Sequence, residues 1–223
     1  SAGVDVEIDW SRSGIDRRTL TFVATGPLSK AEMKVMGPKG LLESLDVDLT
    51  GKKAGEPLAL SWTKAGEVVR ISVKFLDEAG FWQGFESVRV DIPHEEVEFD
   101  SGKSTFGKEE ASKLDSTHAL IVQELRKYDE FPIGLYVSGY TDTVGADGGN
   151  VTLSFARARA IASYFRRKGL RIPIYYQGFG ERVLAVPTAD NVDEPRNRRA
   201  LYILSNAPPV SVQVPGSDWR MVR

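Results

Sequence analysis

The sequence contains no cysteine and only two histidines, His94 and His118. The missing cysteines exclude disulfides, thiolate metal sites, cysteine nucleophiles and a lipid-modified cysteine within this segment. The two histidines stand in different sequence contexts, which disfavours a histidine metal cluster and a Ser-His-Asp relay. We therefore expect neither a metal site nor a cofactor.

The sequence also lacks a long hydrophobic run and a large excess of charge. No apolar run approaches the roughly 20 residues that span a bilayer, and no secretory signal is visible. Because the chain begins Ser-Ala-Gly without methionine, we expect a processed product whose signal or anchor could have stood upstream. The formal net charge of −2 and the pI near 5.8 provide no global positive field for nucleic acid or an anionic membrane surface.

The first 93 residues alternate between apolar and polar side chains with a period of two. The runs begin with "VDVEIDW", and glycine- and proline-containing turns separate them. We therefore predict an all-β sandwich domain over residues 1–93, with about seven short strands and an immunoglobulin-like pattern. Trp10, Trp62 and Trp82 are expected to fill or rim this sandwich, and an exposed pair that lines a sugar site is the alternative.

After Pro93 the pattern changes to strands that alternate with helices. We predict strands at residues 95–100, 133–140, 171–180 and 198–205, and helices at 108–128 and 150–169. Strands separated by helices indicate a second domain, residues 94–206, with a mixed sheet packed against helices. His118 falls on the apolar stripe of the first helix and is expected to be a packed core residue. Residues 207–223 are expected to form an extended or poorly ordered tail.

The stretch "GYTDTVGADGGNVTLSFARARA", residues 139–160, carries charges in unusual places. Arg157 lies one turn from Leu153 and from Ile161, on the helix face that should meet the sheet. Asp142 directly follows a strand, at the sheet edge where ligands of open α/β sheets collect. A buried, unpaired guanidinium is costly, so Arg157 needs a partner. The residues alone leave two alternatives, an internal Asp142–Arg157 salt bridge or a clamp for a ligand that carries both charges.

Several motifs in this half of the chain resemble the OmpA-like C-terminal domain family. The family pattern of asparagine, Leu-Ser, Arg-Ala and an aliphatic residue is matched at the same spacing by Asn150, Leu153, Ser154, Arg157, Ala158 and Ile161. Thr141 and Asp142 match its threonine-aspartate pair, and "YYQGFGE" and "RNRRALYIL" match further family motifs. The resemblance covers about residues 96–206 and implies an α/β fold for them; the N-terminal half is not recognised.

The resemblance also implies a binding site for peptidoglycan. In this family the matched aspartate and arginine hold the zwitterionic end of diaminopimelate in the stem peptide. Asp142 would then accept hydrogen bonds from the ammonium group, and Arg157 would donate a bidentate pair to the carboxylate. Thr141, Leu153 and Ser154 would belong to the same site.

Three further positions carry open interpretations. Tyr140 stands where the family most often has histidine, and we expect it to alter the edge of the pocket without loss of binding. Asn150 is expected either to cap the second helix or to touch the ligand. Arg198, in the family's Asn-Arg-Arg signature, is expected either to contact the ligand or to pair with Glu181 or Glu194.

Together these observations predict a non-catalytic, periplasmic cell-wall tether that binds peptidoglycan noncovalently and links an envelope component to the wall. Attachment to the outer membrane would use a segment absent from this chain. Enzymatic activity is not expected, because arginine does not titrate usefully and Asp142 with Arg157 makes a poor acid/base pair. The alternative is a structural or signalling adaptor, or a stator or secretion component, whose β-sandwich binds a protein partner.

Overall fold

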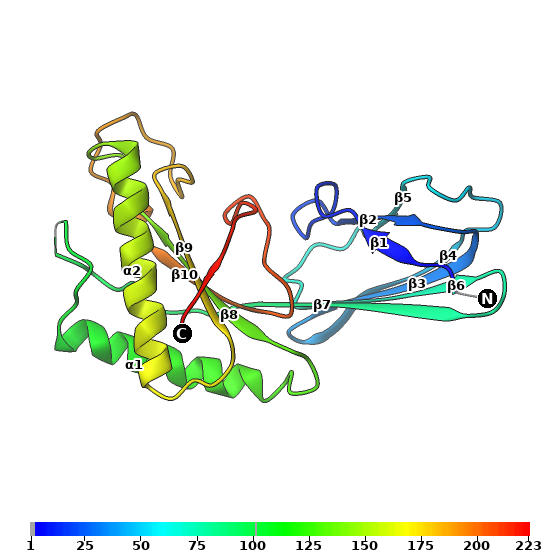
Figure 1. The fold of residues 1–223 in the computed structure, drawn as a ribbon, viewed down its shortest axis with the longest axis horizontal. Helices are drawn as coiled ribbons and strands as arrows, with labels where there is room; N and C mark the ends of the chain where they lie inside the picture. The colour runs from blue at the N-terminus through cyan, green and yellow to red at the C-terminus, as the bar shows by residue number, and fades with distance from the viewer. Residues whose placement is uncertain (1–2, 101) are drawn as a thin grey trace. The chain divides into compact units, whose positions relative to one another are not determined.

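The computed structural model describes residues 3–100 and 102–223. The chain forms two compact units, Ser1–Arg89 and Val90–Arg223, and their boundary falls within strand β7 (Trp82–Asp91) (Figure 1). The domain limits near Pro93 stay a prediction. Neither helix of the described residues is both long enough and apolar enough to cross a membrane.

The N-terminal unit is built from strands that coincide with the apolar runs of the sequence. They are β1 (Val6–Ile8), β2 (Thr19–Ala24), β3 (Leu28–Gly37), β4 (Gly40–Asp48), β5 (Leu58–Ser61), β6 (Arg70–Asp77) and β7. Strands β1, β2 and β5 form one antiparallel sheet, and β7, β6, β3 and β4 pair antiparallel in that order. The period-two pattern predicted these strands correctly.

The apolar faces of these two groups of strands share one core. The rings of Phe22 on β2 and Phe75 on β6 have centroids 4.6 Å apart, and Met33 on β3 is fully buried in the same cluster. Trp62 is 3% exposed, whereas Trp10 and Trp82 are 44% and 50% exposed. One tryptophan therefore fills the core and two lie at the surface, while the immunoglobulin-like sandwich stays a prediction.

The C-terminal unit has a mixed sheet with two helices, as predicted (Figure 1). Its elements are α1 (Lys108–Leu125), β8 (Gly134–Tyr140), α2 (Asp147–Arg167), β9 (Ile174–Gly180), the short 3-10 helix η1 (Pro195–Asn197), β10 (Ala200–Ser205) and β11 (Arg220–Met221). Strand β8 pairs antiparallel with β10 and parallel with β9. The parallel pair requires a crossover, which α2 supplies.

Helix α2 lies against β8 and β9 at unusually short range. A Cβ atom at Gly178 would lie 2.1 Å from the backbone nitrogen of Phe155, and one at Gly139 would lie 2.4 Å from the carbonyl oxygen of Ser154. The Ser154 hydroxyl accepts a hydrogen bond from the backbone N–H of Gly180 at 2.9 Å. These contacts fix the distance between α2 and the sheet. They therefore also fix the positions of the side chains on the first turns of α2.

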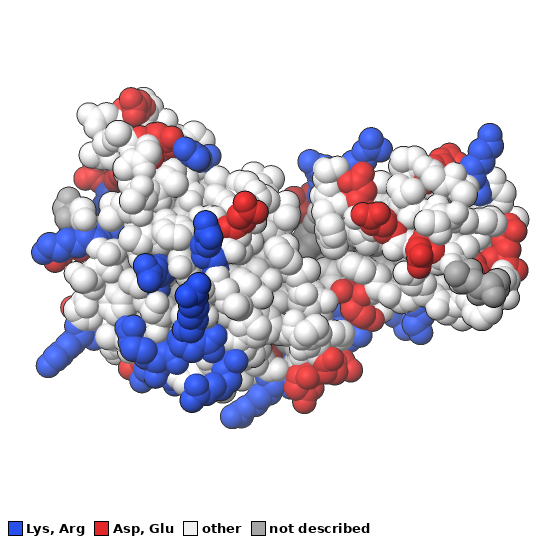
Figure 2. Space-filling view, in the orientation of Figure 1, with Lys and Arg blue, Asp and Glu red and all other residues white. Residues whose placement is uncertain are grey.

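The charge distribution of α2 follows its helix dipole. Asp147 lies in the first turn, and Arg166 and Arg167 lie in the last turn. Carboxylates near the N-terminus and cations near the C-terminus each stabilise a helix by about 0.3–1 kcal/mol. Lysine and arginine side chains gather around this C-terminal end in the space-filling view (Figure 2).

The predicted strand at residues 95–100 is wrong, because side chains make the bonds that a strand ladder would make. The Glu96 carboxylate accepts the backbone N–H of Ala200 at 3.0 Å, and the backbone N–H of Glu98 donates to the Glu110 carboxylate at 2.7 Å. No strand is assigned over these residues. The alternating acidic and apolar pattern that indicated a strand instead serves these carboxylate contacts.

The C-terminal tail, expected to be extended or poorly ordered, packs against the sheet without forming a helix. Val214 is completely buried in a cluster with Tyr136 and Phe179, and Trp219 packs against that cluster. The Tyr140 hydroxyl donates to the carbonyl of Gln213 at 2.6 Å, and β11 adds an antiparallel edge to β9. The apolar side chains of Val214 and Trp219 therefore hold the tail on the sheet.

The close approach of α2 predicts opposite effects for two glycine substitutions. Gly178→Ala should lower the free energy of unfolding by about 3 kcal/mol or more, because its methyl group would meet backbone that cannot move aside. Gly148→Ala is the matched control in the same helix-sheet unit, with open space around the new methyl group, and should raise stability by about 0.5 kcal/mol. Urea denaturation measures both; equal effects would contradict the close contact.

His94, which precedes the Glu96 segment, has only oxygen acceptors around its ring nitrogens. Nδ1 lies 2.8 Å from the carbonyl oxygen of Ile92, and Nε2 lies 3.0 Å from that of Ala200 and 3.3 Å from the Glu96 carboxylate. Only a doubly protonated ring donates from both nitrogens. Burial opposes this charge, but the bonds to Glu96, Ile92 and Ala200 outweigh it and raise the pKa of His94.

The raised pKa of His94 makes stability depend on pH. Protonated His94 contributes to the free energy of unfolding. This contribution is fully present below the ordinary histidine pKa and is lost as pH rises through the raised pKa of the folded protein. The difference in unfolding free energy between the native chain and His94→Phe should therefore be larger at pH 5.5 than at pH 8.5. Glu96→Gln should reduce this pH dependence. Denaturation series at both pH values test it, and a difference that grows toward pH 8.5 would contradict it.

Candidate ligand-binding site

A cavity of about 590 Å³ opens where β8 ends and α2 begins, and we name it the Asp142 pocket. Its lining consists of Phe99, Gly102, Thr141, Asp142, Val144, Asn150, Leu153, Arg157, Asp193 and Arg198. The structure thus brings together six of the eight residues that the sequence indicated. Ser154 and Tyr140 are not among them.

Asp142 is buried at the carboxyl end of β8 and is held by two hydrogen bonds. One carboxylate oxygen accepts the backbone N–H of Val144 at 3.2 Å, and the other accepts the Arg198 guanidinium at 2.5 Å. Arg198 also pairs with Asp193. The alternative of an internal Asp142–Arg157 salt bridge is wrong: within the described residues, Asp142 forms its ion pair with Arg198. The paired position lies 56 residues further along the chain.

Arg157 is half-buried on the opposite side of the pocket and bonds to neutral groups. Its Nε donates to the carbonyl of Lys103 at 3.0 Å and its Nη2 to that of Asp100 at 3.3 Å. The guanidinium also lies over the Phe99 ring, 5.0 Å from its centroid. Burial and the nearby charge of Arg198 lower the pKa of Arg157, against the attraction of Asp142. The group remains a cation, because a guanidinium does not lose its proton in proteins.

Thr141 carries an unsatisfied polar atom in the lining. The residue is 2% exposed, and its hydroxyl has no hydrogen-bond partner among the described residues. Its backbone N–H donates to the carbonyl of Gly180 at 2.9 Å, so the strand holds the residue in place. A buried hydroxyl without a partner costs about 1–3 kcal/mol. Leu153 adds a half-buried apolar wall.

Asn150 scaffolds the loop between β8 and α2. Its amide donates to the carbonyls of Asp142 at 3.4 Å and Val144 at 3.1 Å, and to the Glu181 carboxylate at 2.5 Å. The capping alternative is wrong, because α2 begins three residues earlier, at Asp147, and its N-cap is Ala146. The two glycines after Asp147 weakened the helix signal in the sequence.

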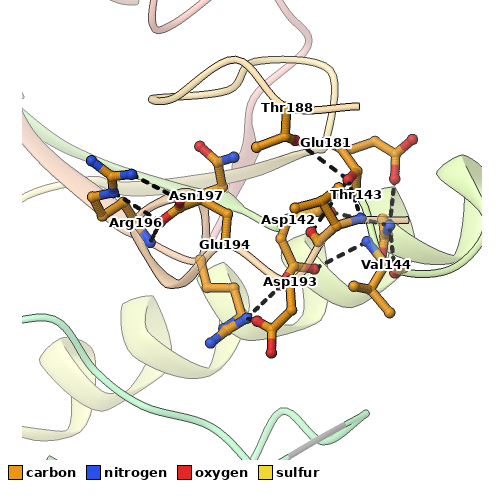
Figure 3. Close-up of polar contacts among 12 residues, drawn as sticks. Asp142, Thr143, Val144, Glu181, Thr188, Asp193, Glu194, Arg196 and Asn197 are labelled. Carbon is orange, nitrogen blue, oxygen red and sulfur yellow. Dashed lines mark hydrogen bonds and ion pairs between the residues drawn. The ribbon is translucent and has the colours of Figure 1, made fainter. Parts of the chain in front are cut away.

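The loop before β10 is fixed by pairs that differ from those expected for the Asn-Arg-Arg signature. Arg196 donates twice to the Glu194 carboxylate, at 2.8 Å each, and these bonds lower the pKa of Glu194 to about 2 (Figure 3). Asn197 is fully buried and bonds to both backbone groups of Val186. Glu194 thus pairs with Arg196, and Glu181 accepts a hydrogen bond from Asn150. Arg198 pairs with Asp142 instead of with either glutamate.

Ser154 and Tyr140 have structural roles behind the pocket. Ser154 is completely buried and joins α2 to β9 through Gly180. The Tyr140 hydroxyl donates to the Gln213 carbonyl and lies 3.1 Å from the Ser138 hydroxyl, and the Tyr140 ring lies 4.0 Å from the Arg199 guanidinium. Conversely, the lining includes Phe99 and Asp193, which the sequence did not indicate. Phe99 belongs to the segment whose strand assignment was wrong, so no signal placed it near the site.

Known proteins similar to this chain match mainly its C-terminal half. The model of the OmpA family matches residues 98–198. Outer membrane protein P5 of Haemophilus influenzae is 36% identical over 109 residues, 48% of this chain and 28% of that protein. A protein of Gloeobacter violaceus named photosystem I P700 chlorophyll a apoprotein A2 is 33% identical over 127 residues, 52% of this chain and 14% of that protein. The chain thus spans under a third of either relative.

Among solved structures, the OmpA-like domain of FopA1 from Francisella tularensis is similar, with 19% identity and a TM-score of 0.38 over 73% of this chain and 82% of that one. The family match coincides with the segment that contains the Asp142 pocket and with the motifs at Asn150, Leu153 and Arg157. The chain therefore contains an OmpA-like domain of the OmpA family at residues 98–198.

Proposed function

We propose that this chain is a non-catalytic cell-wall tether that binds peptidoglycan through the diaminopimelate of the stem peptide. The observation that carries the proposal is the arrangement of the Asp142 pocket. It presents a carboxylate, Asp142, and a guanidinium, Arg157, that form no ion pair with each other within the described residues. Opposite charges on one lining fit a zwitterion.

Each charged group of such a ligand has a counterpart in the pocket. The ammonium group of diaminopimelate binds the Asp142 carboxylate, which Arg198 and the Val144 N–H hold in position. Its carboxylate binds Arg157, whose planar fork matches carboxylate geometry. The Thr141 hydroxyl, which has no partner in the described residues, gains one from the ligand. Leu153 packs against the aliphatic part of the ligand.

The family membership of residues 98–198 and the printed name of the Haemophilus relative, an outer membrane protein, support a place in the cell envelope. We propose a periplasmic location and noncovalent attachment to the wall. The Asp142 pocket favours binding over chemistry, because its cation does not titrate and its buried carboxylate is committed to Arg198. The proposed tether therefore binds peptidoglycan without catalysing a reaction on it.

A second function concerns the N-terminal unit, which we propose binds an envelope protein. Its surface exposes Phe81 and Trp82 by 56% and 50%, beside a cavity of about 330 Å³. Aromatic side chains are enriched at protein interfaces. An adaptor or a stator or secretion component would use this surface, with the wall held by the other unit.

The binding proposal predicts selectivity for diaminopimelate over lysine. In calorimetric titrations, a stem peptide with diaminopimelate should bind, and the same peptide with lysine should bind more weakly because it lacks the second carboxylate. Arg157→Met and Asp142→Asn should each weaken binding at least about thirtyfold, since removing one partner of a buried charge pair costs ~2 kcal/mol or more. Arg159→Met, an exposed neighbour on α2 that does not line the pocket, is the matched control.

Thermal denaturation of the Asp142→Asn variant separates lost binding from lost folding, because Asp142 also anchors Arg198. Unchanged affinity in folded Arg157 and Asp142 variants would refute the proposed pocket. Release of soluble fragments from purified sacculi would instead show an enzyme.

A further inference from the structure

A second cavity, of about 540 Å³, adjoins the Asp142 pocket, and we name it the Arg199 cavity. The two share Phe99, Arg157 and Arg198 in their linings. Tyr140 and Arg199, which do not line the Asp142 pocket, belong to the Arg199 cavity. A ligand that binds Arg157 in the Asp142 pocket therefore lies next to the Arg199 cavity.

Arg199 is a half-buried cation without a carboxylate partner among the described residues. Its Nη1 donates weakly to the carbonyl of Val183 at 3.3 Å, and its Nη2 is buried with no hydrogen-bond partner. The Tyr140 ring, 4.0 Å away, stabilises the guanidinium but neutralises none of its charge. Burial lowers the pKa of Arg199, against the attraction of Tyr140 and of the Glu96 carboxylate. An anion that enters the cavity would compensate the charge of the guanidinium.

Most other charged side chains that line the Arg199 cavity already have a partner. Arg196 pairs with Glu194, and Arg198 pairs with two aspartates. Glu96 accepts the Ala200 N–H with one oxygen and lies 3.3 Å from His94 with the other. Glu98 also lines the cavity, and its negative charge raises the pKa of Lys113 together with the larger effect of Glu110. Arg157 and Arg199 are thus the two lining cations without an ion pair in the described part of the chain.

We propose that the Arg199 cavity is a subsite for a second carboxylate of the stem peptide, the free carboxylate of the glutamate that precedes diaminopimelate. This inference rests on the proposed function of the Asp142 pocket. Because the cavities share Arg157, a peptide whose diaminopimelate occupies the first places its neighbouring residue at the second. Arg199 then contributes a charge-assisted bond that an amidated glutamate cannot accept in the same way.

The subsite predicts discrimination between peptides that differ only in amidation of this glutamate. By calorimetry, the native chain should bind the free peptide about tenfold more tightly than the amidated one, and Arg199→Gln should lose that preference. Arg199→Lys, which keeps the charge, should retain part of it. Arg196→Met is the matched control, since it removes a lining cation that already has its own carboxylate, and should keep the full preference.

Three outcomes would decide against the subsite, and each points to a different error. Equal affinity of the native chain for free and amidated glutamate would refute it while the diaminopimelate site stands. A preference that follows amidation of the peptide's C-terminus would assign the cavity to a different carboxylate. Absence of binding to any diaminopimelate peptide would overturn the proposed function and the subsite together. Melting curves of the Arg199 variants establish that each is folded.

Discussion

Helix α2 lies so close to strands β8 and β9 that no side chain fits at Gly139 or Gly178. The rest of the site depends on this constraint. It allows the Ser154 hydroxyl to bond the end of β9, and it holds the first turns of α2 beside the carboxyl end of β8. Asp142 leaves that strand end and Arg157 leaves that helix, so their separation across the pocket is set by backbone contact. Rigid backbone suits a binding site, because little ordering is then required when a ligand arrives.

The arginines that line the two cavities fall into two groups, those with an ion-pair partner and those without one in the described residues. Arg196 pairs with Glu194 of its own loop, and Arg198 pairs with Asp193 of that loop and with Asp142, which follows β8. Arg157 and Arg199 bond only to carbonyls and aromatic rings in the described residues. A cation that folding has partly dehydrated but not paired is poised to bind an anion, since much of the desolvation cost has already been met. Under the proposed function, this division would let one small domain hold a ligand with several carboxylates.

The two units of the chain use different physical means to specify structure. The N-terminal unit relies on alternating apolar residues that bury one face of each strand, as Phe22 and Phe75 do. The C-terminal unit adds buried polar groups with specific partners, including Asn150, Ser154 and Asn197. Buried polar groups tolerate few alternatives, because each unsatisfied one is costly. The part of the chain that contains the Asp142 pocket is accordingly the part with more buried, hydrogen-bonded polar groups.

The sequence by itself determined the elements and their approximate limits, because hydrophobic periodicity is a local property. Period-two runs predicted the strands of the N-terminal unit, and helical spacing predicted α1 and α2. The sequence also brought Asp142 and Arg157 to one sheet edge, since a strand end and the following helix are adjacent in the chain. Two glycines hid the true start of α2.

Only the tertiary structure decided which charges pair. Arg198 reaches Asp142 across 56 residues, Glu96 takes the place of a strand ladder at Ala200, and the tail folds back so that Gln213 meets Tyr140. None of these partners is near the other in sequence, and any of several arginines or carboxylates has the right chemistry. The choice among chemically equivalent partners is made by distance, and distance is fixed only when α2 and the strands have packed.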